Sequence, residues 1–181
     1  DVVISSRGKV YLKDTQAKGD IKISSTETEI GNKLLAENSV NIQNSKLSNK
    51  GQIQANNNIT INGNVDSSNL ISTNKDITIS GNLKNSGNVS STNLNVKEIE
   101  NLNKIVTGEK LSSTNITNNG KLLVGNTINS QNLTNTSTVQ GRILDIKNKI
   151  NSSGKILADN ITTKDISNSG NISSKIITAQ E

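Results

Sequence analysis

The chain of 181 residues lacks Cys, His, Pro, Met, Trp and Phe, and its one aromatic residue is Tyr11. Without Cys there is no disulfide and no thiolate nucleophile, and without His there is no imidazole base. Ser-His-Asp and Cys-His catalytic sites and zinc sites of the usual Cys and His types are therefore excluded. The absence of Pro suits a protein whose strands are nearly all internal, because each backbone N–H is then needed for pairing.

Apolar residues are also scarce. They make up 30% of the sequence, against the usual 45–50%, a deficit that in a globular protein indicates disorder. No apolar run approaches the roughly 18 residues that a membrane-spanning helix needs. The sequence opens on Asp1, Val2, Val3 and Ile4 instead of a basic segment followed by an apolar one. We therefore expect no membrane insertion and no export signal within this segment.

The net charge of +5 arises from single lysines dispersed among acidic residues. Nucleic-acid sites usually combine a clustered basic patch with aromatic side chains or a groove. With Tyr11 as the only aromatic residue, we expect no nucleic-acid partner.

A regular series of aliphatic residues is what the sequence does have. From Leu47 to Ile172 an aliphatic residue returns every five or six positions. An amphipathic helix would return one every three or four, and a two-faced strand every two. A step of five or six fits a short strand followed by a corner, and three steps close a coil of about 16–18 residues. The sequence predicts an all-β fold, a three-sided parallel β-helix (β-solenoid) of about ten coils and about 50 Å in length.

Taking every third member of the series gives three columns that should stack along the rod. The first column is Ile53, Ile71, Val89, Ile105, Leu122, Val139, Ile156 and Ile172; the second is Ile59, Ile77, Leu94, Leu111, Ile128, Leu144 and Ile161; the third is Leu47, Val65, Leu83, Ile99, Ile116, Leu133, Ile150 and Ile166.

A recurring Asn/Ser-x-Gly triplet marks the corner between the third and the first column. It occurs at 49–51, 85–87, 118–120, 152–154 and 168–170, with a weaker copy at 135–137. Gly adopts positive φ without steric cost and Asn tolerates it better than most residues, so the repeat predicts that the backbone bends the same way at this corner in each coil. Asn amounts to about a sixth of the sequence, which we interpret as turn chemistry and stacked side-chain amides along corners and outer faces instead of a ligand array.

Two pairs of carboxylates are candidates for the acid pair of a polysaccharide-active enzyme: Asp66 with Asp76, and Asp159 with Asp165. Each residue lies near a corner beside Lys or Asn, and there is almost no aromatic side chain to stack on a sugar ring. We expect these four aspartates to be solvated side chains near corners. We therefore predict no enzyme activity and name no catalytic, cofactor-binding, metal-binding or ligand-binding residue.

The sequence divides into residues 1–34, with less regular coils, and residues 35–181, with regular repeats. Strands are expected at 10–12 and 21–23, and a polar loop is expected to bulge out from Ser24 to Glu29. If this segment itself binds a receptor or glycan through an outer face or loop, this loop and Arg142 are the candidates, because recognition often occupies loops on a rigid scaffold.

Residues 76–89 read DITISGNLKNSGNV and residues 164–172 read KDISNSGNI. This motif, aliphatic-x-Asn-Ser-Gly-x-aliphatic in a solenoid register, resembles the haemagglutinin repeats of filamentous-haemagglutinin-type exoproteins. The resemblance covers about residues 35–181.

The resemblance implies a right-handed β-helix that is exported by two-partner secretion and forms the shaft of a surface fibre. Such shafts serve adhesins, biofilm proteins and contact-dependent inhibition systems. The implied location is the bacterial cell surface. The implied partners are neighbouring coils of the fibre, an outer-membrane secretion partner that contacts another part of the protein, and a cell-surface receptor. The predicted coils are shorter than the usual family repeat, and the strict hexads between Leu47 and Val89 are typical of left-handed helices, so a left-handed coil stays open.

Overall fold

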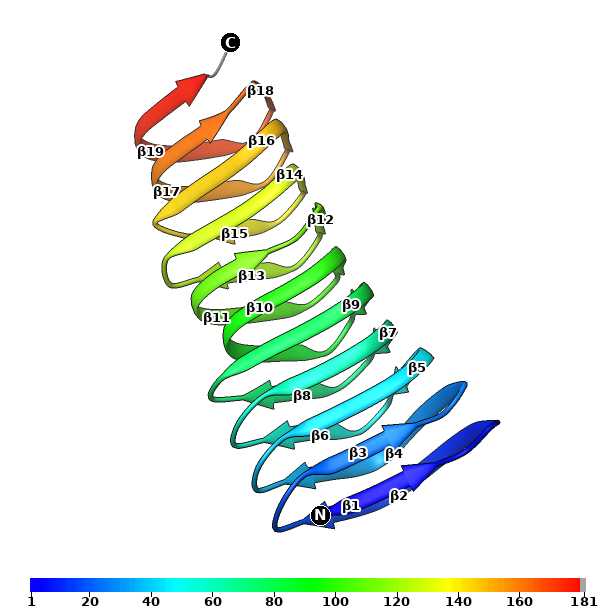
Figure 1. The fold of residues 1–181 in the computed structure, drawn as a ribbon. Helices are drawn as coiled ribbons and strands as arrows, with labels where there is room; N and C mark the ends of the chain where they lie inside the picture. Colours follow the sequence, from blue (N-terminus) through cyan, green and yellow to red (C-terminus); the bar gives the residue numbers. More distant parts are fainter. Residues whose placement is uncertain (180–181) are drawn as a thin grey trace.

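A computed structural model describes residues 1–179, and all regular structure in them is β. The strands form one continuous sheet wound into a stack of about ten coils, with β1 and β19 at opposite ends of the stack (Figure 1). The strands are β1 (Val2–Ser5), β2 (Lys9–Ala17), β3 (Ile21–Ser24), β4 (Glu27–Ala36), β5 (Val40–Asn49), β6 (Gln52–Ala55), β7 (Ile59–Ser67), β8 (Leu70–Thr73), β9 (Asp76–Asn85), β10 (Asn88–Asn101), β11 (Lys104–Ser112), β12 (Asn115–Asn118), β13 (Lys121–Val124), β14 (Thr127–Asn135), β15 (Thr138–Gln140), β16 (Ile143–Ser152), β17 (Lys155–Thr163), β18 (Asp165–Asn168) and β19 (Asn171–Ala179).

Each strand pairs in parallel with strands of the coils before and after it. In the first column Ile53 pairs with Ile71 and Ile71 with Val89. In the third column Leu47 pairs with Val65. The same register holds for every neighbouring pair in all three predicted columns. The predicted β-solenoid and its three aliphatic columns are confirmed.

The coils become shorter along the rod. Val2 pairs with Ile21, Ile21 with Val40, and Val40 with Ile59, so each of the first three coils takes nineteen residues. Later coils take sixteen to eighteen residues. The longest of them runs from Ile59 to Ile77, and one of the shortest runs from Ile161 to Ile177. The predicted coil length is therefore correct from β7 onward but wrong for the first three coils.

The change in length is concentrated at one corner, between the second and third columns, which we call the variable corner. This corner takes eight residues from Val2 to Val10 and five from Leu94 to Ile99. The corner between the third and first columns, which we call the ladder corner, is constant. Its step is six residues in all eight coils from the one at Leu47 and Ile53 to the one at Ile166 and Ile172.

The interior is a dry aliphatic stack. Ile53, Ile77 and Leu111 are fully buried, as are nearly all other members of the three columns before the last coil. The second column carries further buried aliphatics two residues on, at Ile61 and Ile79, because alternate residues of a strand lie on the same face. Burying one such side chain stabilises the fold by about 1.5–3 kcal/mol.

The corner glycines have a different role from the predicted one. Among residues 1–179 only Gly63 has a φ in the positive range, at +154°. At Gly51, Gly87 and Gly120 a Cβ would instead collide with the backbone carbonyl oxygen of the preceding coil, at Asn32, Asn69 and Asn103 respectively. Glycine is needed here for close stacking of coils. The corner does repeat from coil to coil, as predicted, but positive φ was the wrong reason for its glycines.

The loop expected from Ser24 to Glu29 does not bulge out. Ser24 ends β3, Glu27 begins β4, and only Ser25 and Thr26 lie between these strands. Thr28 is 1% exposed and pairs with Val10 and Leu47 in the third column. Because the polar Thr28 stands in an otherwise aliphatic column, the sequence of this coil looked irregular and suggested a loop.

Candidate functional site

A row of buried asparagines lies inside the ladder corner. Its members stand two residues after each third-column aliphatic, and we call the row the Asn ladder: Asn49, Ser67, Asn85, Asn101, Asn118, Asn135, Ser152 and Asn168. All of them up to Ser152 are at most 2% exposed. The predicted stacking of amides at a corner is confirmed, but the expected place on an outer face is wrong for this row, because its side chains are buried.

Each amide in the middle of the ladder bonds to its own coil and to the next one. Asn118 Nδ2 donates to Asn135 Oδ1 at 2.8 Å, to the carbonyl of Gly120 at 2.8 Å and to the carbonyl of Thr138 at 3.0 Å. Asn101 Nδ2 in turn donates to Asn118 Oδ1 at 2.7 Å. The bonds therefore point along the direction of the rod, and every polar atom of the Asn118 side chain has a partner, as buried amides require.

Two interruptions leave oxygen atoms without a donor. Ser67 takes an Asn position, and its Oγ donates to the carbonyl of Asn69; Asn85 Oδ1, one coil further, is buried without a partner. Ile30 pairs with Asn49, and Asn49 Oδ1 is likewise without a partner. Both orphaned oxygens belong to the amide that follows an interruption, as the direction of the bonds requires.

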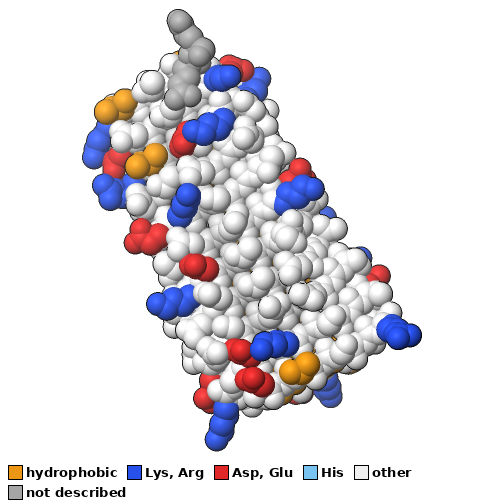
Figure 2. All heavy atoms as spheres, in the orientation of Figure 1, with side chains coloured by type: hydrophobic (Ala, Val, Ile, Leu, Met, Phe, Trp, Pro, Cys, Tyr) orange, Lys and Arg blue, Asp and Glu red, His pale blue; other side chains and the backbone are white. Residues whose placement is uncertain are grey.

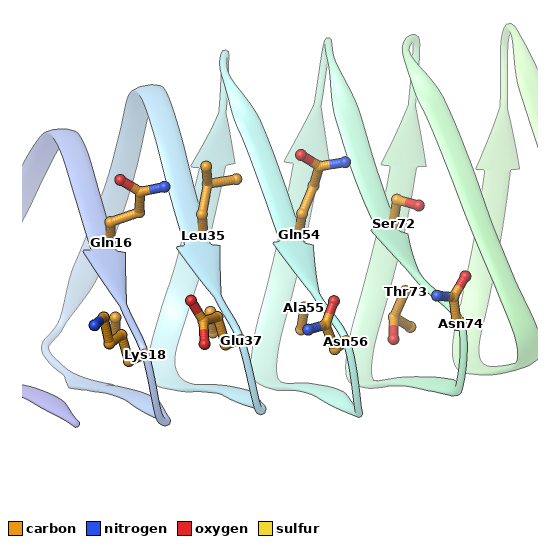
Figure 3. Close-up of a pocket in the computed structure, with 12 residues that line it drawn as sticks. Gln16, Lys18, Leu35, Glu37, Gln54, Ala55, Asn56, Ser72, Thr73 and Asn74 are labelled. Atoms are coloured by element: carbon orange, nitrogen blue, oxygen red, sulfur yellow. The ribbon is translucent and has the colours of Figure 1, made fainter.

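A groove of about 600 Å³ runs over the corner between the first and second columns, across β2, β4, β6 and β8. Two rows of side chains line it (Figure 3), and its lining also includes the buried residues Ala36, Ala55 and Thr73. The upper row in the figure is Gln16, Leu35, Gln54 and Ser72, and the lower row is Lys18, Glu37, Asn56 and Asn74. The lining combines amides, two hydroxyls and one charge of each sign with aliphatic side chains.

A second groove, of about 540 Å³, lies at the variable corner of β9, β10, β11 and β14. Hydroxyl and amide side chains line it together with Lys97 and Lys147. Lys147 Nζ is 2.8 Å from Asp145 Oδ2. Two lysines do not make a concentrated cluster of positive charge, so the groove has no marked preference for an anion.

The strongest ion-pair cluster joins three coils near the N-terminal end. Glu29 Oε2 lies 2.7 Å from Lys9 Nζ, and Glu29 Oε1 lies 2.6 Å from Lys50 Nζ. Hydrogen bonds from Lys50 and Lys9 lower the pKa of Glu29 from its ordinary 4.5 to about 2, and the bond to Glu29 raises the pKa of Lys9. The cluster ties successive coils together on the outer surface.

The structure does not bring the candidate carboxylate pairs together. Asp66 lies on the third-column side opposite Lys84, whereas Asp76 accepts a hydrogen bond from Asn93 on the second-column side. Asp159 lies 2.9 Å from Lys175 Nζ, and a hydrogen bond from this lysine lowers the pKa of Asp159. Asp165 is on another strand.

Asp165 lies 3.2 Å from Lys149 Nζ, so it also faces a cation instead of a second acid. Arg142, the other candidate outside the predicted loop, is exposed at a shallow groove of about 340 Å³, and its Nε is 3.8 Å from Asp159 Oδ2. It is one partner of a surface ion pair.

The face shown in Figure 2 is mostly neutral. Charged side chains lie mainly along its margins and ends, and uncharged polar side chains and backbone cover the middle. Within residues 1–179 no group of three or more His, Cys, Asp or Glu side chains is placed to hold a metal ion. In the same described residues no helix is long and apolar enough to cross a membrane.

Comparison with protein-family models, with curated proteins and with solved structures found no match.

Proposed function

We propose that this segment is a structural rod of a large exported bacterial surface adhesin or contact-dependent inhibition protein, and that it projects a distal binding or toxin element from the cell. The observation that supports a rod is that three aliphatic columns keep the same register along successive coils, with the Asn ladder beside them. The exported adhesin rests on the resemblance of residues 76–89 and 164–172.

The Asn ladder suits a rod because it couples each coil to the next in the interior. In a solenoid each repeat contacts only its neighbours, so stiffness depends on these interfaces. If a coil slipped along its neighbour, the buried amides would lose their partners, at about 1–3 kcal/mol for each unsatisfied group. The ladder therefore favours one register over all others.

A deletion series tests the rod. Leu94, Leu111 and Ile128 occupy the same column, so removing residues 94–127 removes two whole coils and rejoins the backbone in phase. We expect this variant to fold and to be about 10 Å shorter by small-angle X-ray scattering. Removing residues 94–118 rejoins the backbone out of phase and should abolish cooperative unfolding. Equal tolerance of both deletions would contradict a register-dependent rod.

A binding measurement tests whether the rod is passive. The protein, purified and fluorescently labelled, should show no saturable binding to candidate target cells although it is folded by circular dichroism. Saturable binding would make this segment an adhesive module.

The groove over β2, β4, β6 and β8 favours a second candidate function, in which this segment binds a glycan or receptor through an outer face. Its rows of amides can bond to hydroxyl groups along an extended ligand. If the labelled protein binds cells, Gln54→Lys should weaken the binding more than tenfold, and Thr134→Lys, an exposed position on the third-column side, should leave it unchanged.

A further inference from the structure

Two Asn-Gly dipeptides occur in the sequence, Asn62-Gly63 and Asn119-Gly120. In such a pair the backbone nitrogen of Gly can attack Cγ of the Asn amide. The bond between Cγ and Nδ2 breaks, ammonia leaves, and a five-membered succinimide forms. Water then opens the ring at either carbonyl and leaves aspartate or isoaspartate. Gly favours the reaction because it has no side chain to block the rotation that the attack requires.

Backbone pairing decides whether that rotation is available, because a paired strand holds the Gly nitrogen away from the Asn side chain. At Asn62-Gly63 the pairing is interrupted on both sides. Toward β5 the register runs from Gln43 with Asn62 to Lys46 with Asn64, so Gly63 faces a bulge. Toward β9 the pairing stops at Ile61 and resumes at Val65.

The side chain at this site is also unrestrained. Asn62 is exposed, and within residues 1–179 no hydrogen bond holds its amide. Gly63 is the residue with positive φ, +154°, and is partly exposed. Gly63 packs closely against the preceding coil, because the carbonyl oxygen of Asn44 stands where its Cβ would be. The Asn62 amide, which must rotate onto the Gly63 nitrogen, is open to water.

The second dipeptide is held in place. The backbone N–H of Asn119 donates to Asn101 O at 2.8 Å, and that of Lys121 donates to Asn103 O at 2.6 Å. Asn119 Oδ1 accepts a hydrogen bond from Thr136 Oγ1 at 2.7 Å. Gly120 is buried, whereas Gly63 is partly exposed, although each has the backbone of the preceding coil, at Asn103 and Asn44 respectively, where a Cβ would stand. Rotation at Gly120 would require the coils to separate at the ladder corner.

We propose that Asn62 is a site of spontaneous deamidation in the folded protein and that the fold protects Asn119. The product carries one more negative charge, so the net charge of +5 becomes +4. Isoaspartate also lengthens the backbone by one atom. The variable corner accommodates this change because its length already differs between coils, as the intervals from Val2 to Val10 and from Leu94 to Ile99 show. The rod therefore changes its surface charge with age and keeps its fold.

The test compares the two dipeptides in one molecule. The folded protein is incubated at pH 8.5 and 37 °C, samples are digested, and the peptides containing residues 62 and 119 are quantified by mass spectrometry for the mass gain of about 1 Da. We expect Asn62 to convert at least tenfold faster than Asn119. In a parallel incubation in concentrated denaturant the two rates should come within about threefold of each other, because the fold no longer separates them.

Equal rates in the folded protein, or a faster Asn119, would overturn the proposal. Asn62→Asp tests the consequence independently of the rate. This variant should keep the midpoint of thermal unfolding and the circular dichroism spectrum of the native protein. Asn119→Asp is the matched substitution at the protected site. Loss of folding by Asn62→Asp would show that the corner does not accommodate the product.

Discussion

Asn118 Nδ2 donates a hydrogen bond of 2.8 Å to Oδ1 of Asn135, which stands at the equivalent position one coil further along the rod. Both side chains are buried, and the same Asn118 amide reaches two backbone carbonyls. A buried amide is therefore a connector between coils at this corner, where an aliphatic residue could only fill space. Because these bonds have a fixed direction, the first two predictions concern single donor or acceptor atoms.

Asn118→Asp should destabilise the fold strongly. The carboxylate keeps the shape of the amide but cannot donate, and the oxygen that replaces Nδ2 would face Asn135 Oδ1 and the carbonyls of Gly120 and Thr138. We expect a loss of about 3 kcal/mol or more in the free energy of unfolding. Urea denaturation followed by circular dichroism measures it. The control is Asn119→Asp at the exposed neighbouring position, which should cost less than about 0.5 kcal/mol; similar losses for both variants would show that the ladder is not what matters.

Ser67→Asn should stabilise the fold. An amide at this position can donate to Asn85 Oδ1, which is buried without a partner. The coil geometry already accommodates Asn at Asn49 and Asn85 on either side. We expect a gain of about 1 kcal/mol in the free energy of unfolding. A double-mutant cycle with Asn85→Ala checks the mechanism: the gain should disappear when Asn85 is absent, and a gain that survives would have another origin.

The sequence contains the signal for the ladder, but the expected turn chemistry obscured it. Asn or Ser stands two residues after every third-column aliphatic from Leu47 onward, and residues two apart in a strand share a face. Asn118 therefore lies on the same, inward face of its strand as Ile116. The aliphatic columns were predictable because their period fits no other fold.

The strands expected at 10–12 and 21–23 are confirmed, since they lie within β2 and β3, but the column positions of the early coils and the grooves could not be predicted. Thr15 and Thr28 occupy aliphatic columns, where they pair with Leu34 and Leu47 respectively. Thr28 tolerates burial because its hydroxyl bonds to Ser25 Oγ at 2.8 Å, a contact that depends on the folded corner. The groove lined by Gln16 and Gln54 depends on how far side chains of successive coils stand apart, which a pattern of residue types does not contain.

Gly120→Ala should destabilise the rod. A Cβ at Gly120 would collide with the backbone of Asn103 in the preceding coil, and backbone cannot move aside as a side chain can. We expect a loss of about 2 kcal/mol in the free energy of unfolding. At Gly108 the nearest atom to a Cβ is 3.7 Å away. Gly108→Ala is thus a matched control that should be neutral or slightly stabilising, and a loss as large as that of Gly120→Ala would refute the stacking explanation.

Glu29 should contribute to acid unfolding within a defined pH window. Its pKa is lowered to about 2 from an ordinary 4.5 by Lys50 and Lys9, so the unfolded protein binds this proton more readily than the folded one. The stabilisation is present above about pH 4.5 and is lost as the pH falls toward 2. Glu29→Gln should therefore flatten the fall of thermal stability between these values. The control is Glu37→Gln, and the explanation fails if both variants keep the native slope.

The two corners should differ in their tolerance of inserted residues. A Gly-Ser insertion between Gly63 and Asn64 lengthens the variable corner, whose length already differs between coils, and should cost less than about 1 kcal/mol, because lengthening a flexible loop adds little entropy. The same insertion between Ser86 and Gly87 lengthens the constant ladder corner. It would displace Gly87 O from Asn85 Nδ2, now 3.1 Å apart, and Gly87 N from Ser67 O, now 3.2 Å apart. We expect a loss of about 3 kcal/mol or more at this second site, measured by urea denaturation of both variants. Equal tolerance would mean that the constant six-residue step is not enforced by the ladder, and that register along the rod comes from the aliphatic columns alone.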